Sequence, residues 1–268
     1  MLTNFLRNLL TAYVRKKPKE EQHRLRDRVF AFQTGPFGWL ANIPCRFLFG
    51  GNLKMLATIY MTDKWNYHWY VQHYEEHLKQ NRRKQINLLE IGIGGYDNPR
   101  MGGNSLRMWS DFLPNGRVFG VDIFDKSSHD RKRIKTFRGS QVDSAFLDMV
   151  VREIGRIDVI IDDGSHINEH ILFTFQYLFP HLADGGVYIV EDAHTSYWSE
   201  FGGNEVDRND PTTAMGYFKS LVDGLDWEEF RGNYNPTYLD QNIKSVAFYH
   251  NLIIVRKGAN REGGCPAD

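Results

Sequence analysis

The chain has 268 residues, 41% of them hydrophobic and 14% aromatic, and its 33 Lys and Arg balance 33 Asp and Glu. This length suits one large domain or a domain with an extension, and the zero formal charge argues against binding nucleic acid or anionic lipid by bulk attraction. The two cysteines, Cys45 and Cys265, support neither a disulfide framework nor a cysteine-based zinc site, so we expect a reducing, cytoplasmic location.

The balanced charge is distributed unevenly along the chain. Residues 1–30 carry eight Lys and Arg against three Asp and Glu, whereas residues 160–207 carry nine Asp and Glu and no Lys or Arg. Acids without cationic partners must be solvated or be neutralised by something outside the sequence. The segment 160–207 is therefore a candidate cation site.

The first 57 residues predict a helical extension. Residues 1–14 are largely apolar and precede the basic run Arg15-Lys16-Lys17, an order that does not fit a secretory signal. We expect an amphipathic helix that packs on the domain or on a neighbouring subunit of a homo-oligomer, and weak contact with a membrane surface is the alternative. No stretch approaches the ~18 apolar residues of a membrane span, so stable membrane insertion is not expected.

Two further helical stretches are predicted at 18–36 and 37–59, and the pattern then changes in kind. Short apolar runs alternate with helical segments, which is typical of a parallel sheet covered by helices on both faces. A terminal hairpin, with its turn at His250-Asn251, would add an antiparallel last strand. The expected strands are 86–91, 118–123, 134–137, 157–161, 187–190, 246–249 and 252–255, and the expected helices are 105–112, 144–154, 168–182 and 212–225.

A glycine-rich loop, Gly92-Ile93-Gly94-Gly95, follows the first predicted strand. Glycine lets the backbone turn sharply and lets a ligand approach the main chain. The second strand ends at Asp122, an acid suited to holding a ribose diol, so the pair favours a nucleotide-type ligand over a tight turn without one. Glu90 at the end of the first strand fits badly against a pyrophosphate and suits a positively charged ligand without phosphate. A nicotinamide cofactor fits less well, because the G-x-G-x-x-G pattern is absent.

Two acidic pairs follow the fourth and fifth predicted strands, Asp162-Asp163 and Glu191-Asp192. If these strands are neighbours, both pairs lie at the same sheet edge as the glycine loop, where four acids would repel one another strongly. A hard divalent cation such as Mg²⁺ removes that difficulty, because it prefers oxygen ligands. We predict Asp163, Glu191 and Asp192 as the metal ligands, with Asp162 facing the cofactor. The alternative is that these acids cap helices or face water.

Five ordered strings carry a resemblance to a known family: LLEIGIGGYDNP, GGNSLRMW, GVDIFDKSSHD, IDDGSH and VEDAHTSYW. Together they resemble class I S-adenosylmethionine-dependent methyltransferases, and more narrowly the metal-dependent sugar O-methyltransferases of the mycinamicin (macrolide) type. The resemblance covers residues 58–205. It implies an α/β fold with a Rossmann-like, seven-stranded, mostly parallel sheet, a domain at 58–268, and S-adenosyl-L-methionine and Mg²⁺ as cofactors.

The resemblance also implies roles for particular residues. The loop glycines and the Tyr that follows them would cradle the methionine part and the ribose, and Gln141 would lie near the adenine. Thr62 belongs to a segment that resembles one folding over the cofactor, and its assignment is weaker. The predicted cofactor-binding residues are Thr62, Glu90, Gly92, Gly94, Gly95, Tyr96, Asp122, Gln141 and Asp162.

The implied reaction is transfer of a methyl group from a sulfonium to a hydroxyl oxygen. Coordination to Mg²⁺ lowers the pKa of the hydroxyl, and His166, three residues beyond Asp163, is the predicted catalytic base. His194 follows the second acidic pair in the same way and is a weaker candidate. The aromatic and polar segment 197–204 suits a sugar, on a natural product or a glycan, although it could equally be a packed loop or a subunit contact.

Three other classes of function remain open at this point. One is a nicotinamide-dependent oxidoreductase, and another is an iron(II) oxygenase that uses His166, His194 and a carboxylate. The third is a non-enzymatic binding module whose working part is the basic N-terminal arm.

Overall fold

The computed structural model describes residue 21 and residues 50–265. Nearly all of the predicted N-terminal extension lies outside these residues, including the helix expected at 1–14 and all but residue 21 of the helix expected at 18–36. The extension, its role in assembly and the domain boundary at 57/58 therefore stay predictions. Within the described part of the chain, no helix is both long and apolar enough to cross a membrane.

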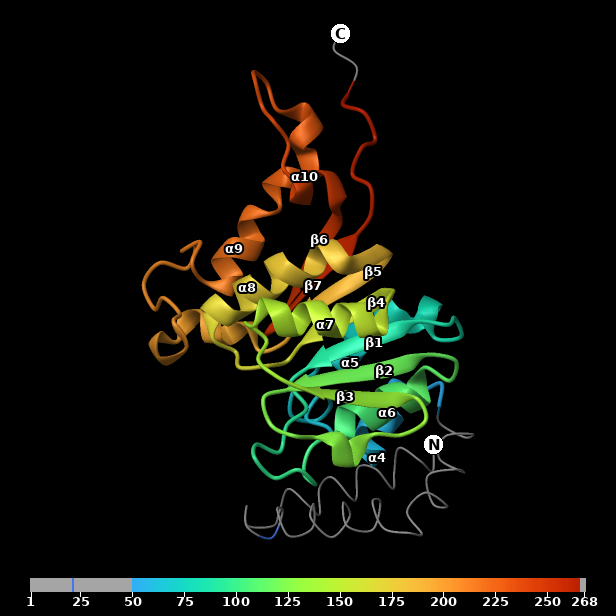
Figure 1. The fold of residues 1–268 in the computed structure, drawn as a ribbon. Coiled ribbons are helices and arrows are strands. Elements are labelled where there is room, and N and C mark those ends of the chain that lie inside the picture. The colour runs from blue at the N-terminus through green and yellow to red at the C-terminus, as the bar shows by residue number, and fades with distance from the viewer. Residues whose placement is uncertain (1–20, 22–49, 266–268) are drawn as a thin grey trace.

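A seven-stranded sheet forms the centre of the fold (Figure 1). Its strand order is β3-β2-β1-β4-β5-β7-β6. The first five strands in this order are parallel to one another, and β7 is antiparallel to both β5 and β6. This confirms the predicted fold class, and it makes β1 and β4 the strands between which the chain order reverses, where α/β sheets bind ligands. The strands are β1 Asn87–Ile91, β2 Arg117–Asp122, β3 Ile134–Arg138, β4 Ile157–Asp162, β5 Leu182–Val190, β6 Ile243–Tyr249 and β7 Leu252–Lys257.

Helices cover both faces of the sheet and bury one hydrophobic core on each. Successive residues of the central strands alternate between the two cores: Leu88 packs in one and Leu89 in the other. The first core contains side chains of α4, α5 and α6, and the second those of α7, α8 and α9. The helices are α4 Leu53–Ile59, α5 Val71–Leu78, α6 Asn104–Phe112, α7 Ser144–Ile154, α8 Asn168–Leu178, α9 Ala214–Ser220 and α10 Tyr238–Asn242.

Several predicted boundaries were wrong. The helix expected at 168–182 ends at Leu178, where Pro180 accompanies a 3₁₀ turn over Phe179–His181, and β5 begins directly afterwards at Leu182. The helix expected at 212–225 is divided into α9 and a 3₁₀ segment, Asp223–Glu229. Neither α5 nor α10 was predicted.

The terminal hairpin was predicted correctly. Strands β6 and β7 pair antiparallel, and the turn between them contains Asn251 with a φ of 62°. Asn adopts this left-handed conformation more readily than most residues, which suits a tight hairpin turn.

The central strand provides a test of the core. Ile160 on β4 is fully buried, and β4 pairs with β1 on one side and β5 on the other. We expect Ile160→Ala to lower the free energy of unfolding by about 2–5 kcal/mol, because it leaves a cavity where the core cannot collapse. The control Ile123→Ala removes a side chain that is 61% exposed and should cost no more than about 0.5 kcal/mol. Urea denaturation of the two variants measures both values, and similar losses would contradict this placement of the core.

Candidate active site

A cavity of about 900 Å³ opens at the carboxyl edge of the parallel strands. Its walls come from the segments that follow β1, β2, β3 and β4, together with residues 60–64 before α5. Three predicted site residues, Glu90, Asp162 and Glu191, are not among its lining residues. Those that line it are Thr62, Gly92, Gly94, Gly95, Tyr96, Asp122, Gln141, Asp163, His166 and Asp192.

The strand ends bring the two halves of the cavity together. The backbone N–H of Asp163 donates to Ile91 O at 2.9 Å, and the N–H of Glu191 donates to Asp162 O at 3.0 Å. The ladder of the sheet thus continues one residue beyond each strand. Consequently, the acids after β4 and β5 lie beside the end of β1, where the glycine loop begins.

Two glycines of the loop serve different purposes. A Cβ on Gly92 would lie 1.9 Å from Asp163 O, so only glycine permits β1 and β4 to approach at this point. A Cβ on Gly94 would meet nothing within 4 Å, and Gly94 has a φ of +75° that disfavours other residues. Gly92 therefore allows the segments after β1 and β4 to pack together in the cavity wall, and Gly94 leaves space at the surface of the loop for a ligand.

Asp122 is held rigidly at the wall of the cavity. Its Oδ2 accepts a hydrogen bond from Ile93 N at 3.0 Å, and its Oδ1 accepts one from Phe124 N at 2.9 Å. A carboxylate has about four lone-pair directions, so each oxygen retains capacity to accept from a hydroxyl. This arrangement fits the predicted role in holding a ribose.

Gln141 lines the cavity while connecting its loops. Its Oε1 accepts from Ser165 N at 2.9 Å, and its Nε2 donates to Thr174 Oγ1 at 3.0 Å. The same Nε2 lies 3.3 Å from Asp162 Oδ1, and Tyr188 donates to Asp162 Oδ2 at 3.3 Å. Asp162 is thereby buried behind the wall, and burial raises its pKa to about 7.

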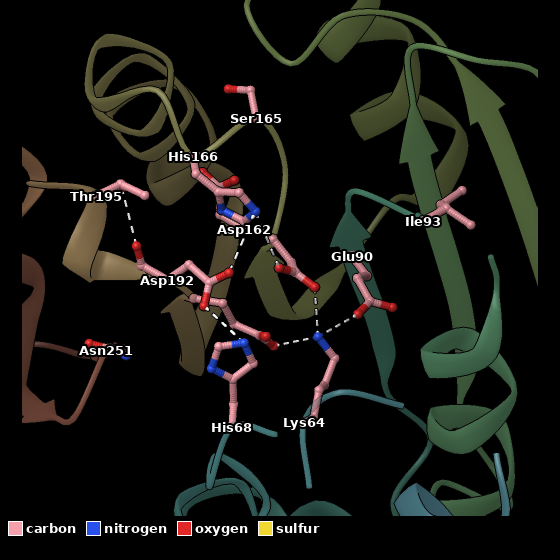
Figure 2. Close-up of polar contacts among 12 residues, drawn as sticks. Lys64, His68, Glu90, Ile93, Asp162, Ser165, His166, Asp192, Thr195 and Asn251 are labelled. Atoms are coloured by element: carbon pink, nitrogen blue, oxygen red, sulfur yellow. Dashed lines mark hydrogen bonds and ion pairs between the residues drawn. The ribbon is translucent and has the colours of Figure 1, made fainter. Parts of the chain in front are cut away.

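Lys64 lies among three acids at the floor of the site (Figure 2). Its Nζ is 2.7 Å from Asp163 Oδ2, 2.6 Å from Glu191 Oε1 and 3.4 Å from Glu90 Oε1, and its side chain is 1% exposed. Burial opposes the charge of Lys64, but the carboxylates of Asp163, Glu191 and Glu90 raise its pKa well above the ordinary value. The expectation that acids in this segment are either solvated or neutralised from outside the sequence did not include Lys64, which pairs with two of them from within the chain.

Glu191 has a second polar partner besides Lys64. Tyr74 on α5 donates its hydroxyl to the same Glu191 oxygen that contacts Lys64. Burial raises the pKa of Glu90 to about 7 although Lys64 opposes that shift, and burial also raises the pKa values of Asp163 and Glu191. Burial therefore disfavours the charged forms of these three acids, and Lys64 offsets part of that cost.

Asp192 is surrounded by an aromatic hydroxyl and histidines. Tyr70 donates to its Oδ1 at 2.6 Å, and the Nε2 of His68 lies 3.7 Å from the same oxygen. The Nε2 of His166 lies 3.7 Å from Oδ2, and the Nδ1 of His194 lies 4.0 Å from Oδ1. Figure 2 shows His68 and His166 on opposite sides of this carboxylate.

The backbone at two of these positions is unusual. His166 has a φ of 59° and Asp192 a φ of 53°, in the left-handed region that costs energy for residues other than glycine. Conformations of this kind persist where the surrounding structure enforces them, and they cluster at functional sites. Here they direct both side chains toward the same point of the cavity.

The donor set fits a divalent cation. Asp163, His166 and Asp192 each offer one ligand atom, and these atoms lie within 4.8 Å of one another. Two of the three predicted ligands, Asp163 and Asp192, belong to this group. Glu191, the third, lies behind them with its Oε1 engaged by Lys64 and Tyr74.

Four residues of the segment 64–74 contribute to the site without having been predicted from the sequence. Lys64, His68, Tyr70 and Tyr74 all reach the acidic edge from this segment. The local signal was the dense run of rings and one cation in Lys64-Trp65-Asn66-Tyr67-His68-Trp69-Tyr70. Nothing in that run identifies partners 99 to 127 residues away along the chain.

Comparisons with known proteins bear on this geometry. The chain is 45% identical over 218 residues to the mycinamicin VI 2''-O-methyltransferase of Micromonospora griseorubida. The aligned region covers 80% of this chain and 55% of that protein. It is 44% identical over 214 residues to the 8-demethyl-8-alpha-L-rhamnosyl tetracenomycin-C 2'-O-methyltransferase of Streptomyces olivaceus, covering 79% and 56%. The chain resembles sugar O-methyltransferases. This confirms the resemblance inferred from the motifs.

A solved structure agrees with the sequence comparison. A methyltransferase of the mycinamycin biosynthetic pathway, in complex with Mg, SAH and mycinamycin VI, has a TM-score of 0.77 and 45% identity, over 80% of this chain and 55% of that one. The chain thus spans about half the length of the relatives it matches. No protein-family model matches it.

The ion pairs of Lys64 predict a large effect on stability. Lys64→Met keeps much of the side-chain length but leaves the buried Glu191 and the partly buried Asp163 without their cation. In the presence of a chelator, we expect the free energy of unfolding to fall by about 3–5 kcal/mol, as for other buried pairs that lose one partner.

The matched control is Lys135→Met. Lys135 pairs with Glu153 at the surface, where the two side chains are 43% and 51% exposed, so its loss should cost no more than about 1 kcal/mol. Thermal and urea unfolding compare the variants. A loss for Lys64→Met as small as that of the control would show that Lys64 does not hold the acids together.

Proposed function

We propose that this chain is a Mg²⁺-dependent O-methyltransferase that moves the methyl group of S-adenosyl-L-methionine to a hydroxyl of a small, glycosylated acceptor. The observation that carries the proposal is the single cavity that joins the glycine loop and Asp122 to Asp163, His166 and Asp192. A nucleotide-type site and a cation site at one sheet edge are what methyl transfer to a metal-held hydroxyl requires. The similar proteins named above are O-methyltransferases, which supports the same conclusion.

The residues around the glycine loop would hold S-adenosylmethionine. Gly92, Gly94, Gly95 and Tyr96 supply its surface, and Tyr96 is 85% exposed and free to pack against a ligand. Asp122 would accept from the ribose hydroxyls, and Gln141 and Thr62 also line the cavity. Glu90 and Asp162 would act from behind the wall, through Lys64 and Gln141 respectively.

We retain Asp163, Glu191 and Asp192 as the proposed metal ligands. Asp163 and Asp192 face the cavity, and Glu191 stabilises the position of Asp163 through their shared contact with Lys64. When bound, Mg²⁺ would supply Lewis-acid polarisation of the acceptor hydroxyl, and S-adenosylmethionine would supply the transferable methyl.

His166 is the proposed base. Its Nε2 lies 3.7 Å from Asp192 Oδ2 and 4.0 Å from Asp163 Oδ1, so the ring stands beside the proposed metal ligands, where the acceptor hydroxyl would be held. S-adenosylmethionine would supply the methyl group to the acceptor oxygen, and His166 would accept the proton that the hydroxyl loses.

The acceptor proposed here is a sugar on a natural product or a glycan. Phe201 lines the cavity, and Trp198 is 45% exposed and packs edge-on against His194 at 4.5 Å. Aromatic faces beside polar groups suit a sugar ring carried on an apolar body. Comparisons that find O-methyltransferases give no support to the oxidoreductase or iron oxygenase alternatives. Assembly as a homo-oligomer and a cytoplasmic location stay predictions.

Replacement of the base is the first test. We expect His166→Asn to lower the rate of methyl transfer by about 10²–10⁴-fold, the usual contribution of a positioned base, while binding of SAH is retained. Asn is chosen because it tolerates the positive φ at this position. The exposed His181 gives the control His181→Asn, which should keep full activity. Wild-type turnover by His166→Asn, in a labelled-methyl assay, would remove this residue from the mechanism.

Removal of the metal is the second test. EDTA should abolish methylation by the wild type, and excess Mg²⁺ should restore it, because the acceptor hydroxyl needs the cation to lose its proton. Asp192→Asn should stay inactive when Mg²⁺ is added, whereas the exposed control Asp184→Asn should behave like the wild type. Full activity in EDTA would assign the acids a structural role instead.

A further inference from the structure

A second buried lysine, Lys126, lies beneath the loop between β1 and α6. It follows Asp122 by four positions in the connection after β2, and its side chain is 1% exposed. Its Nζ donates to three backbone carbonyls, Tyr96 O at 2.6 Å, Asn98 O at 2.9 Å and Met101 O at 3.3 Å. All three belong to that one loop.

These contacts use the full donor capacity of the ammonium. A lysine has three N–H donors, and burial of a charged group is expensive unless each is satisfied. Burial lowers the pKa of Lys126, and its three acceptors are carbonyls rather than carboxylates. Lys126 is not among the residues that line the cavity. It therefore acts on the loop and not on a bound ligand.

The loop requires such a support. Gly94, Gly95 and Tyr96 have consecutive positive φ values of 75°, 80° and 47°. Glycine adopts this region without penalty, but Tyr pays for it. The carbonyl of Tyr96 accepts the shortest of the three hydrogen bonds from Lys126, so the ammonium stabilises the strained residue directly.

Neighbours of Lys126 support the rest of the same loop. Ser128 donates its hydroxyl to Pro99 O, and the Nε2 of His129 lies 3.2 Å from Met101 O. Asp122, at the start of the connection, accepts from Ile93 N at 3.0 Å. The connection 122–129 thus contacts the loop from its first residues to its last.

We propose that Lys126 is a positioning residue for the cofactor, which holds the loop 92–101 in the shape that lines the cavity. The inference rests on the proposed function, because the ligand concerned is a nucleoside carrying a sulfonium or thioether. Since Lys126 touches neither ligand nor metal ligands, its loss should weaken cofactor binding and leave the chemical step intact.

The test compares the affinity for SAH of the wild type, Lys126→Met and the control Lys132→Met by titration calorimetry. Lys132 is an exposed lysine of the same β2–β3 connection. We expect Lys126→Met to weaken SAH binding roughly tenfold or more, since hydrogen bonds to a charged group are among the stronger ones, and the control to bind as the wild type does. In steady-state assays, the KM for S-adenosylmethionine should rise while kcat and the KM for the acceptor stay unchanged.

A structural readout separates loss of the loop from loss of the fold. Amide hydrogen exchange of Lys126→Met should accelerate at residues 94–103 and stay slow in β4. Should Lys126→Met not fold, Lys126→Arg decides, because its charge is retained but its larger head group cannot repeat the three contacts. Weaker SAH binding by Lys126→Arg supports the proposal.

Two results would overturn the proposal, and they differ from failure of the proposed function. SAH affinity unchanged in the folded Lys126→Met, or unchanged in Lys126→Arg where only that variant folds, contradicts the role of Lys126. A wild type that binds no SAH contradicts the proposed function itself, whatever the variants do.

Discussion

The buried ion pairs of Lys64 with Asp163 and Glu191 connect parts of the chain that the sheet alone does not bring together. The two acids follow β4 and β5, whereas Lys64 comes from the segment between α4 and α5. Carboxylates at this depth are costly unless they are paired. The segment before the sheet must therefore lie across the strand ends, and with it come His68 and Tyr70, which reach Asp192.

Lys64 also reduces the net negative charge of the site. The acids of 160–207 have no cation in their own segment, but Lys64 neutralises part of their charge from within the fold. What remains directed at the cavity is Asp163 and Asp192, with His166 between them. Two carboxylates facing an open cavity suit Mg²⁺, which keeps several of its coordination positions for water and substrate.

Sequence patterns predicted the parts of the site that depend on sheet topology. Acids at the ends of β4 and β5 and glycines after β1 meet because parallel strands place their carboxyl ends at one edge. The same reasoning correctly placed Asp122, whose strand ends beside β1. The fold class followed from apolar strands that alternate with helices, although the ends of α8 and α9 did not.

Sequence patterns could not predict contacts that depend on packing between distant segments. Lys64 and Glu191 are 127 positions apart, and no periodicity relates them. Asp162 was expected to face the cofactor, but it is buried against Tyr188 and Gln141. Successive side chains of a strand point to opposite faces, so a single position along β4 decides whether an acid faces the cavity. The carbonyl contacts of Lys126 could not be predicted either, because every residue has a backbone carbonyl and the sequence does not indicate which of them a lysine will contact.

The proposed function requires a metal and a cofactor in the same cavity. Crystals grown with Mn²⁺, as an anomalous substitute for Mg²⁺, and with SAH would test this in one experiment. We predict an anomalous peak bound by the carboxylates of the proposed ligands Asp163, Glu191 and Asp192, with the nucleoside against the glycine loop and Asp122. A metal bound elsewhere, or SAH absent from the cavity at saturating concentration, would contradict the account.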